Sequence, residues 1–327
     1  MKFIKETEQW KKQCQYLLNI SANGDPMDYL PKCSSYKDVL KLVLSRILGE
    51  DIYRHYLGVT PEPAPRIPES ISLKKFNDPD PFTRKTRKIG QNYFWVYYPE
   101  YFELTVEGDS PFYLDKEDDP NDQEAPRLIL KENKAGLLEW AVKKIGLVAE
   151  LEKRVLRVPN TINNINTLFK HPKHGHPSFY KVSTHIFPDE DHIISREFGN
   201  KRTRSKWMCM RKDAIGKYKT FSQQQKTAEK AGAVIPSLFE RITFNLAAHV
   251  TSNIYPDGDK LRIIARTDTL LYSYPFKNSS PMISVFACGK GDSSGLDVKQ
   301  LTTNDKKDLI GAAVAFTDEI SSESMQR

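Results

Sequence analysis

Residues 93–106, with the sequence YFWVYYPEYFELTV, decide the fold class of this chain of 327 residues. Aromatic and β-branched side chains dominate residues 93–98 and 101–106, and these are the residue types enriched in β-strands. Pro99 and Glu100 interrupt the run, so the sequence predicts two strands joined by a turn. We therefore expect a β-sheet in the main body of the protein.

Helical patterns precede these strands. Apolar residues recur at helical spacing in the first 18 residues and again, as a wide stripe, over residues 39–57. Ser34 or Ser35 can serve as the N-cap of the second helix, and Gly58 stands where a C-terminal cap is expected. The N-terminal segment is therefore predicted to be helical, and such a helical pair needs a surface to pack against.

Further helices are expected after the strands. Residues 235–250 (IPSLFERITFNLAAHV) predict a buried helix, and Thr302 with Asp305 resembles a capping box before a last helix through residues 309–316. Strands are predicted over residues 206–210, 260–274 and 282–288. Because helices and strands do not alternate strictly, the sequence predicts an α+β fold.

The expected order is a helical N-terminal segment followed by a mixed, mainly antiparallel sheet body with packed helices. The helical segment covers residues 1–58. Residues 59–92 form a basic connector, since six prolines between Thr60 and Phe82 leave few backbone donors for a regular element. The α+β body covers residues 93–327 and contains a basic loop and strand region at 170–220.

The composition bounds the class of protein. Hydrophobic residues make up 39% of the chain and aromatic residues 11%, which is typical of a folded globular protein. The sequence has no apolar run of the roughly 18 residues that a membrane span requires, and the first residues lack the apolar core of a secretion signal. The four cysteines are far apart, which indicates reduced thiols and predicts a cytoplasmic, non-secreted protein without membrane partners.

Charge is concentrated in residues 196–219, REFGNKRTRSKWMCMRKDAIGKYK. This segment carries nine Lys and Arg against Glu197 and Asp213, a net charge of +7 that equals the net charge of the whole chain. A second basic cluster occupies residues 84–88. Clustered cations interleaved with Trp207 and Tyr218 are what a surface for polyanions needs, because the cations neutralise phosphates and the rings stack on unpaired bases.

The sequence therefore predicts a nucleic-acid-binding protein that engages phosphates, with RNA or another single-stranded nucleic acid preferred. The helical pair and the proline-rich connector favour a subunit of a nucleoprotein assembly, in contact with other protein subunits. An adaptor whose basic segment meets an acidic protein partner is an alternative. The predicted nucleic-acid-binding residues are Arg84, Lys85, Arg87, Lys88, Arg196, Lys201, Arg202, Arg204, Lys206, Trp207, Arg211, Lys212, Lys217 and Lys219.

A metal-dependent nuclease is the other alternative, and binding without catalysis is preferred over it. Such enzymes hold Mg²⁺ or Mn²⁺ with acids and place a lysine near the attacking water. Asp268, followed by Asp297 and Lys299 on a later segment, is the neater of two loose matches to this requirement. No cofactor is predicted outside this alternative.

Histidines gather between residues 171 and 192, where five of the seven in the chain occur. Side chains of this type are common metal ligands, and the candidates in this stretch are His174, His176, Asp189 and His192. The spacing matches no established ligand pattern, and prolines flank the two central histidines. Ordinary surface histidines are therefore the preferred interpretation, and no metal site is predicted.

Overall fold

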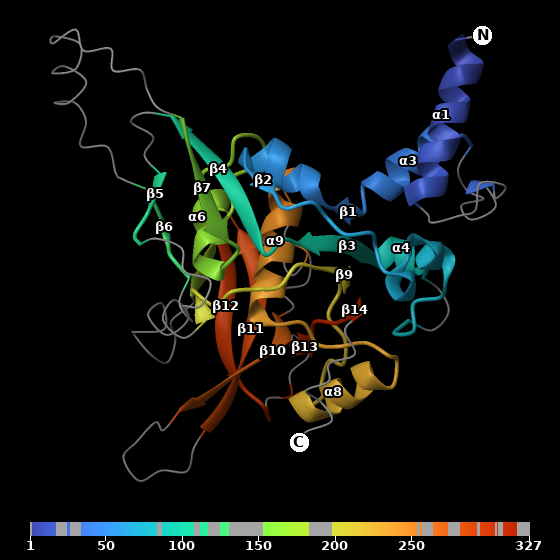
Figure 1. The fold of residues 1–327 in the computed structure, drawn as a ribbon. Coiled ribbons are helices and arrows are strands. Elements are labelled where there is room, and N and C mark those ends of the chain that lie inside the picture. The colour runs from blue at the N-terminus through green and yellow to red at the C-terminus, as the bar shows by residue number, and fades with distance from the viewer. Residues whose placement is uncertain are drawn as a thin grey trace, which may run out of the picture.

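The computed structural model describes residues 2–17, 25–26, 34–83, 87–107, 112–116, 125–130, 153–182, 198–253, 256, 264–273, 282–292, 295–304, 306 and 310–318. The fold is α+β, as predicted: helices pack around separate β-sheets without regular alternation (Figure 1). Of the ten strand pairs formed by the described residues, seven are antiparallel. The mainly antiparallel character of the body is therefore confirmed.

The first sheet is built on the aromatic segment. Strand β3 (Tyr93–Tyr98) pairs antiparallel with β9 (Lys206–Arg211) along its whole length. Strand β1 (Ile47–Leu48) adds in parallel beside β3, and β14 (Ala315–Thr317) adds beside β9. Nearly every side chain of β3 and β9 is buried, because this sheet is covered on both faces.

The second sheet has the strand order β13, β10, β11, β12, β8. Its strands are β13 (Ile310–Ala312), β10 (Ile264–Ser273), β11 (Met282–Asp292), β12 (Gly295–Thr302) and β8 (Tyr180–Val182). The short segment 310–317 contributes β13 to this sheet and β14 to the first one. One stretch of chain therefore joins the two sheets.

Helix α9 (Leu238–Ser252) lies at the centre of the molecule (Figure 1). Ser237 is its N-cap and forms a capping box with Glu240, so the helix begins after Pro236 rather than at it. Eleven of its residues are buried, because it packs on η1 (Ile52–Leu57), α6 (Ile162–Lys170) and the second sheet. The predicted buried helix is confirmed.

The upper part of the body holds two smaller sheets (Figure 1). Strand β4 (Tyr101–Glu107) lies between β2 (Thr60–Pro61) and β7 (Lys153–Pro159), and β5 (Phe112–Leu114) pairs with β6 (Leu128–Leu130). The prediction of strands on both sides of Pro99 is thus confirmed. The two strands belong to different sheets, so the intervening turn is not a hairpin.

The N-terminal segment is helical, but its second helix is shorter than predicted. Helices α1 (Lys2–Leu17) and α3 (Tyr36–Leu44) project from the body, and Ser35 caps α3 as expected (Figure 1). The apolar stripe then continues through β1 and the π-helix η1 (Ile52–Leu57), not through one helix. Pairing of Ile47 and Leu48 with β3 is the physical reason, since tertiary contacts override local helical periodicity. Gly58 adopts the predicted left-handed cap with φ 71°.

The proline-rich stretch also contains regular structure, contrary to expectation. Two 3-10 helices, η2 (Glu69–Ile71) and η3 (Leu73–Asn77), precede the short helix α4 (Ile89–Asn92). Ile71, Leu73 and Phe76 are buried against the first sheet. Short 3-10 turns fit between prolines, and the apolar side chains that they carry anchor the segment to the body.

The predicted last helix is wrong. Residues 310–317 form β13 and β14, and the predicted capping box begins at the end of β12. The run from Ile310 to Ala315 is buried at every position, which is typical of a strand covered on both faces. A Cβ on Gly311 would lie 2.8 Å from the backbone carbonyl oxygen of Ile215, so this close approach of the backbone requires glycine at position 311. In the part of the chain that the structure describes, no helix has the length and apolar character needed to span a lipid bilayer.

Candidate functional site

The basic segment 196–219 is divided by a buried strand. Its middle residues form β9 inside the first sheet, so the cations before and after β9 stand at opposite ends of a strand about 17 Å long, at 3.3 Å per residue. The indole of Trp207 is only 6% exposed, packs against Tyr97 and donates from Nε1 to the carbonyl of Pro65 at 2.7 Å. The prediction that Trp207 stacks on a base is therefore corrected.

Arg211 is also an interior residue. Its Nε and Nη2 donate to Oδ2 of Asp80 at 3.2 and 3.1 Å, and the two side chains are 5% and 0% exposed. Asn92 donates to the same oxygen, and Tyr93 and the backbone N–H of Phe82 donate to Oδ1. This buried pair holds the structure together, so Arg211 is removed from the residues expected to contact a ligand.

The pKa of Asp80 reflects these contacts. Burial by itself would raise the pKa of the carboxyl, but the hydrogen bond from Asn92 and the charge of Arg211 outweigh it and hold the pKa below its usual value. The pKa of the Tyr93 hydroxyl is raised, first by burial and then by the neighbouring Asp80 charge. Asp80 is therefore ionised at neutral pH and balances the charge of Arg211.

Lys206 is engaged as well. Its Nζ lies 2.5 Å from Oε1 of Glu240, whose side chain is 8% exposed, while the backbone N–H of Ser237 donates to the other carboxylate oxygen. Both oxygens of Glu240 are thus occupied by contacts that fix the start of α9.

The Glu240 carboxylate also affects Asp268. The Asp268 side chain is exposed to solvent, yet desolvation by the surrounding protein and the charge of Glu240 raise the pKa of Asp268 to about 7.

The cations after β9 meet the second basic cluster. Nη1 of Arg87 lies 3.2 Å from Oδ2 of Asp213, and the backbone N–H of Lys212 donates to the carbonyl of Asn92 at 2.7 Å. Two clusters that are more than a hundred residues apart in sequence therefore adjoin in space. Helix α8 (Phe221–Glu229) extends this region, because Lys219 Nζ donates to Thr227 on the helix at 3.2 Å.

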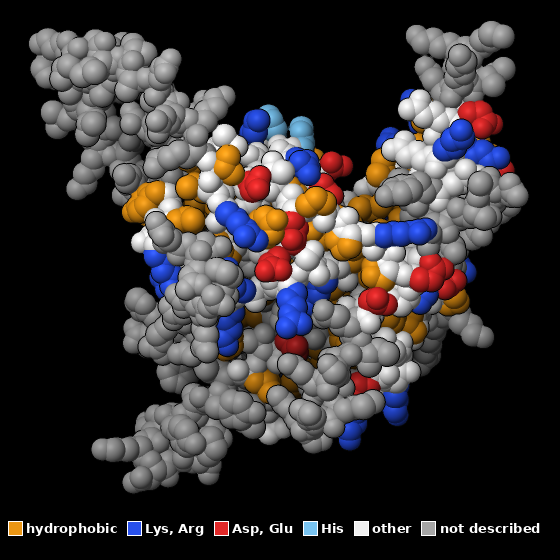
Figure 2. Space-filling model, in the orientation of Figure 1, with side chains coloured by type: hydrophobic (Ala, Val, Ile, Leu, Met, Phe, Trp, Pro, Cys, Tyr) orange, Lys and Arg blue, Asp and Glu red, His pale blue; other side chains and the backbone are white. Residues whose placement is uncertain are grey.

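We call this region the basic surface. Figure 2 shows lysine and arginine side chains at the lower edge of the molecule, where Figure 1 places α8. The acids within residues 212–230 are Asp213, which pairs with Arg87, and Glu229. All of its cations are exposed except the half-buried Lys212. The basic surface consists of Arg87, Lys88, Lys212, Lys217, Lys219, Lys226 and Lys230.

Two buried arginines hold the backbone of this surface from inside. Arg241 on α9 donates to the carbonyls of residues 211 and 212 at 2.8 and 2.9 Å. Arg266 on β10 donates to the carbonyl of Lys219 at 3.3 Å and to the side-chain oxygen of Gln224 at 3.1 Å. Both guanidinium groups are fully buried, so the loop between β9 and α8 is fixed at both ends.

Tyr218 stands at the tip of this loop. Its side chain is 67% exposed, and its backbone has a positive φ of 60°, one of two such non-glycine residues in the described chain. Gly216 supplies a second left-handed position with φ 67°, and its carbonyl accepts from Gln224 at 2.9 Å. The turn thus presents an aromatic ring between Lys217 and Lys219.

The cations before β9 lie in a different setting. Lys201 and Arg204 are exposed, and Lys201 Nζ lies 4.9 Å from the centre of the Phe198 ring. Arg202 is half-buried. Three other predicted cations, Arg84, Lys85 and Arg196, lie outside the described residues. The described cations of the predicted set therefore do not form one group. The larger group lies in the basic surface together with Lys226 and Lys230, which the sequence analysis did not include.

The three predicted catalytic residues lie on two strands that are not neighbours in the second sheet. Asp268 is on β10, whereas Asp297 and Lys299 are on β12, with β11 between them. Strands spaced 4.7–4.9 Å apart place these two backbones about 10 Å from each other. The side chains of Asp297 and Lys299 lie outside the described part of the structure. The register therefore does not place the three residues on adjacent strands.

The histidines form pairs that the sequence did not indicate. His174 stacks on His55 of η1 with ring centres 4.9 Å apart, and His176 meets His249 of α9 edge-on at 6.3 Å. Asp189 and His192 are outside the described residues. Among the side chains that the structure does describe, no group of three or more metal-ligating residues is present.

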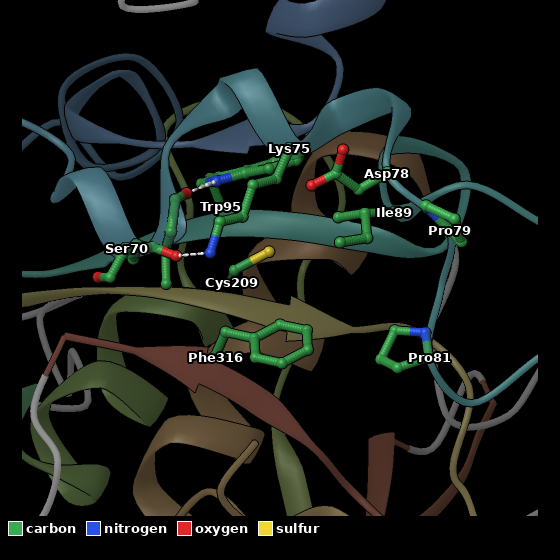
Figure 3. A pocket seen from close by; sticks show the side chains of 10 residues that line it. Ser70, Lys75, Asp78, Pro79, Pro81, Ile89, Trp95, Cys209 and Phe316 are labelled. Atoms are coloured by element: carbon green, nitrogen blue, oxygen red, sulfur yellow. Dashed lines mark hydrogen bonds between the residues drawn. The ribbon is translucent and has the colours of Figure 1, made fainter. Parts of the chain in front are cut away.

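A pocket that the sequence did not reveal lies against the first sheet (Figure 3). Its volume is about 430 Å³, and it opens between β3, β9 and β14 on one side and the segment from η2 to α4 on the other. Most of its lining is apolar. The lining residues are Ser70, Ile71, Lys75, Asp78, Pro79, Pro81, Ile89, Trp95, Cys209 and Phe316.

Comparison of the chain with protein-family models, with curated proteins and with solved structures finds no match.

Proposed function

We propose that the protein binds nucleic acid through phosphate contacts on the basic surface. The observation that carries the proposal is the meeting of two sequence-distant basic clusters through Arg87, Asp213 and Lys212. Residues 87–88 and 212–230 carry seven cations against Asp213, which already pairs with Arg87, and Glu229, while the exposed Asp78 lies beside Lys88. A local excess of this kind attracts a polyanion and releases its counterions on binding.

Preorganisation supports the proposal. The carbonyls of residues 211, 212 and 219 are bound by Arg241 and Arg266, so the loop that carries Lys217 and Lys219 is held before any ligand arrives. A surface whose backbone is already ordered loses less conformational entropy on binding than a flexible loop does. The basic surface is therefore better suited to a polyanion than the same cations on a solvated loop.

A single-stranded ligand, RNA or DNA, fits this surface best. Tyr218, one of the rings that the sequence indicates for stacking, is exposed between two lysines, whereas Trp207 is buried. Stacking of an unpaired base on an aromatic ring contributes about 1–3 kcal/mol and requires a base that is free of a duplex. The proposed ligand is therefore RNA or another single strand, held by phosphates and one stacked base.

The salt dependence of binding tests the proposal. Binding of a fluorescein-labelled single strand is measured by fluorescence anisotropy over a range of KCl concentrations. Reversal of Lys217, Lys219 and Lys226 to Glu should lower the log–log salt slope by about 2, since each phosphate contact on a single strand contributes about 0.7. Affinity should fall at every salt concentration.

The matched control reverses three exposed cations on other elements, Lys170, Lys201 and Arg204. Its slope should stay close to that of the wild type. A larger loss in the control would place the binding site before β9 instead. No binding of the wild type at low salt would refute the proposed function altogether.

The alternatives have distinct outcomes in the same assay. Cleavage of the strand that requires Mg²⁺ or Mn²⁺ and is lost in Asp268→Asn would support the nuclease hypothesis. Equal affinity for an acidic protein and for nucleic acid would support the adaptor. Packing of residues 1–58 against other subunits stays a prediction, as does a cytoplasmic location.

A further inference from the structure

The apolar pocket shares a wall with the basic surface. The segment from Asp78 to Pro81 runs antiparallel to the residues before α4, with a bridge between Pro79 and Lys88. The N–H of Ile89 donates to the carbonyl of Asp78, and the N–H of Asp80 donates to the carbonyl of Arg87, both at 2.9 Å. The pocket-lining residues Asp78, Pro79 and Ile89 and the exposed cations Arg87 and Lys88 therefore lie on the same small ladder.

The interior of the pocket suits a flat, mostly apolar group. Figure 3 shows Trp95 and Ile89 on one side, Phe316 and Pro81 on the other, and Cys209 between them. Trp95 Nε1 is already satisfied by the carbonyl of Ile71 at 2.6 Å. Burial raises the pKa of the Cys209 thiol well above its usual value, so the thiol is neutral and the floor carries no charge.

Polar groups stand at the rim of the pocket. Asp78 is exposed and offers carboxylate oxygens as acceptors, and Lys75 is exposed and donates to the carbonyl of Ser70. The Ser70 hydroxyl donates to Asp318 at 2.6 Å. An occupant should thus be flat in the middle and should carry hydrogen-bonding groups at its edge, and it should be linked to a negative charge that the neighbouring cations can hold.

We propose that this pocket receives an unpaired base of the nucleic acid that the basic surface holds. A nucleobase has an apolar face for Phe316 and Pro81, and an exocyclic amino group that a carboxylate such as Asp78 can accept from. The volume of about 430 Å³ lies in the range of pockets for small ligands. The adjoining phosphates are then close to Lys88 and Lys75.

This inference rests on the proposed function and adds the recognition of a base to it. Phosphate contacts alone carry no information about bases, whereas a pocket with a defined rim acceptor discriminates among them. The Asp78 carboxylate favours bases that carry an amino group, such as cytosine. The chain should therefore prefer a base-bearing strand over a bare sugar–phosphate backbone.

The experiment compares a strand of about 12 deoxycytidines with an abasic strand of the same length, both fluorescein-labelled. The wild type should bind the deoxycytidine strand at least about tenfold more tightly. Ser70→Phe, which places a ring at the pocket mouth, should lose about tenfold on the deoxycytidine strand and nothing on the abasic strand. Ser252→Phe, at the exposed end of α9, is the matched control and should bind both strands as the wild type does.

A second variant covers the case in which Ser70→Phe does not fold. Asp78→Ala removes only an exposed carboxylate, and it should weaken binding of the deoxycytidine strand about fivefold without changing binding of the abasic strand. Unchanged binding of deoxycytidine by the folded variants overturns the base pocket and leaves the proposed function standing. Equal binding of the two strands by the wild type overturns both the base pocket and stacking on Tyr218, and leaves only the phosphate contacts of the basic surface. Failure of the wild type to bind either strand refutes the proposed function itself.

Discussion

Replacement of Asp80 by Asn tests the interior network that joins the two basic clusters. The carboxylate accepts hydrogen bonds on both oxygens from Arg211, Asn92, Tyr93 and the backbone of Phe82. An asparagine has one acceptor oxygen, so its NH₂ group would face donors on one side whichever way it turned. The guanidinium of Arg211, 5% exposed, would also lose its counterion.

The expected cost follows from these contacts. Removal of one partner of a buried ion pair costs about 3–5 kcal/mol, because the remaining charge is left in a desolvated position. The free energy of unfolding is measured by urea denaturation at pH 7 with tryptophan fluorescence. Asp80→Asn should lower the midpoint while the slope m is unchanged, which indicates loss of stability without a change in exposed surface.

Asp213→Asn is the matched control. It removes a carboxylate from a pair whose side chains are 56% and 41% exposed, and exposed pairs contribute about 0–1 kcal/mol. If the two variants lost the same small free energy of unfolding, the buried network would not be what holds this part of the fold.

The pH dependence of stability is a second check. The folded pKa of Asp80 is lowered, so its stabilisation is present above the unfolded value of about 3.9 and is lost as pH falls through the folded pKa. The difference between wild type and Asp80→Asn should therefore shrink below pH 4.

Asp268 and Cys209 give two further predictions, one on stability and one on thiol reactivity. The folded pKa of Asp268 is raised to about 7, so the stability linked to this group is present at pH 4 and is lost as pH rises toward 7. Asp268→Asn should hence be more stable than wild type at pH 8 and should lose that advantage near pH 4, as thermal unfolding would show; an equal effect at both pH values would contradict the assignment. Burial raises the pKa of the Cys209 thiol, so this thiol should react slowly with Ellman's reagent at pH 8. The number of rapidly reacting thiols should therefore be the same in wild type and Cys209→Ala. One fewer fast thiol in the variant would show that Cys209 is accessible.

The elements that the sequence predicts well are those whose local and tertiary preferences agree. Tyr93–Tyr98 is rich in aromatic and β-branched residues and is also a central strand. Ser35 and Gly58 are at the helix ends where their side-chain or backbone properties place them. In residues 45–57 the two preferences conflict. The apolar residues there recur at helical spacing, but Ile47 pairs with Trp95 of the neighbouring strand, and this pairing ends the helix.

The candidate site was only partly predictable, because charges counted along a chain are not charges counted in space. The sequence shows cations in residues 196–219, but it does not show that Asp80 and Glu240 each take one of them. The pocket is invisible for the same reason. Its walls come from segments as distant as Ser70 and Phe316, and no local pattern links them.

One signal in the basic segment does distinguish its two halves. Trp207 to Met210 is a run of four apolar residues between cations, and such a short run is typical of a strand buried on both faces. A buried strand places the flanking cations at its opposite ends, about 17 Å apart, so they do not form one compact patch. Among the residues that the structure describes, the part of the segment after the strand meets the second basic cluster, through the contact of Arg87 with Asp213. The position of that contact, beside the wall of the apolar pocket, is why the binding of phosphates and the recognition of a base are expected on the same side of β9.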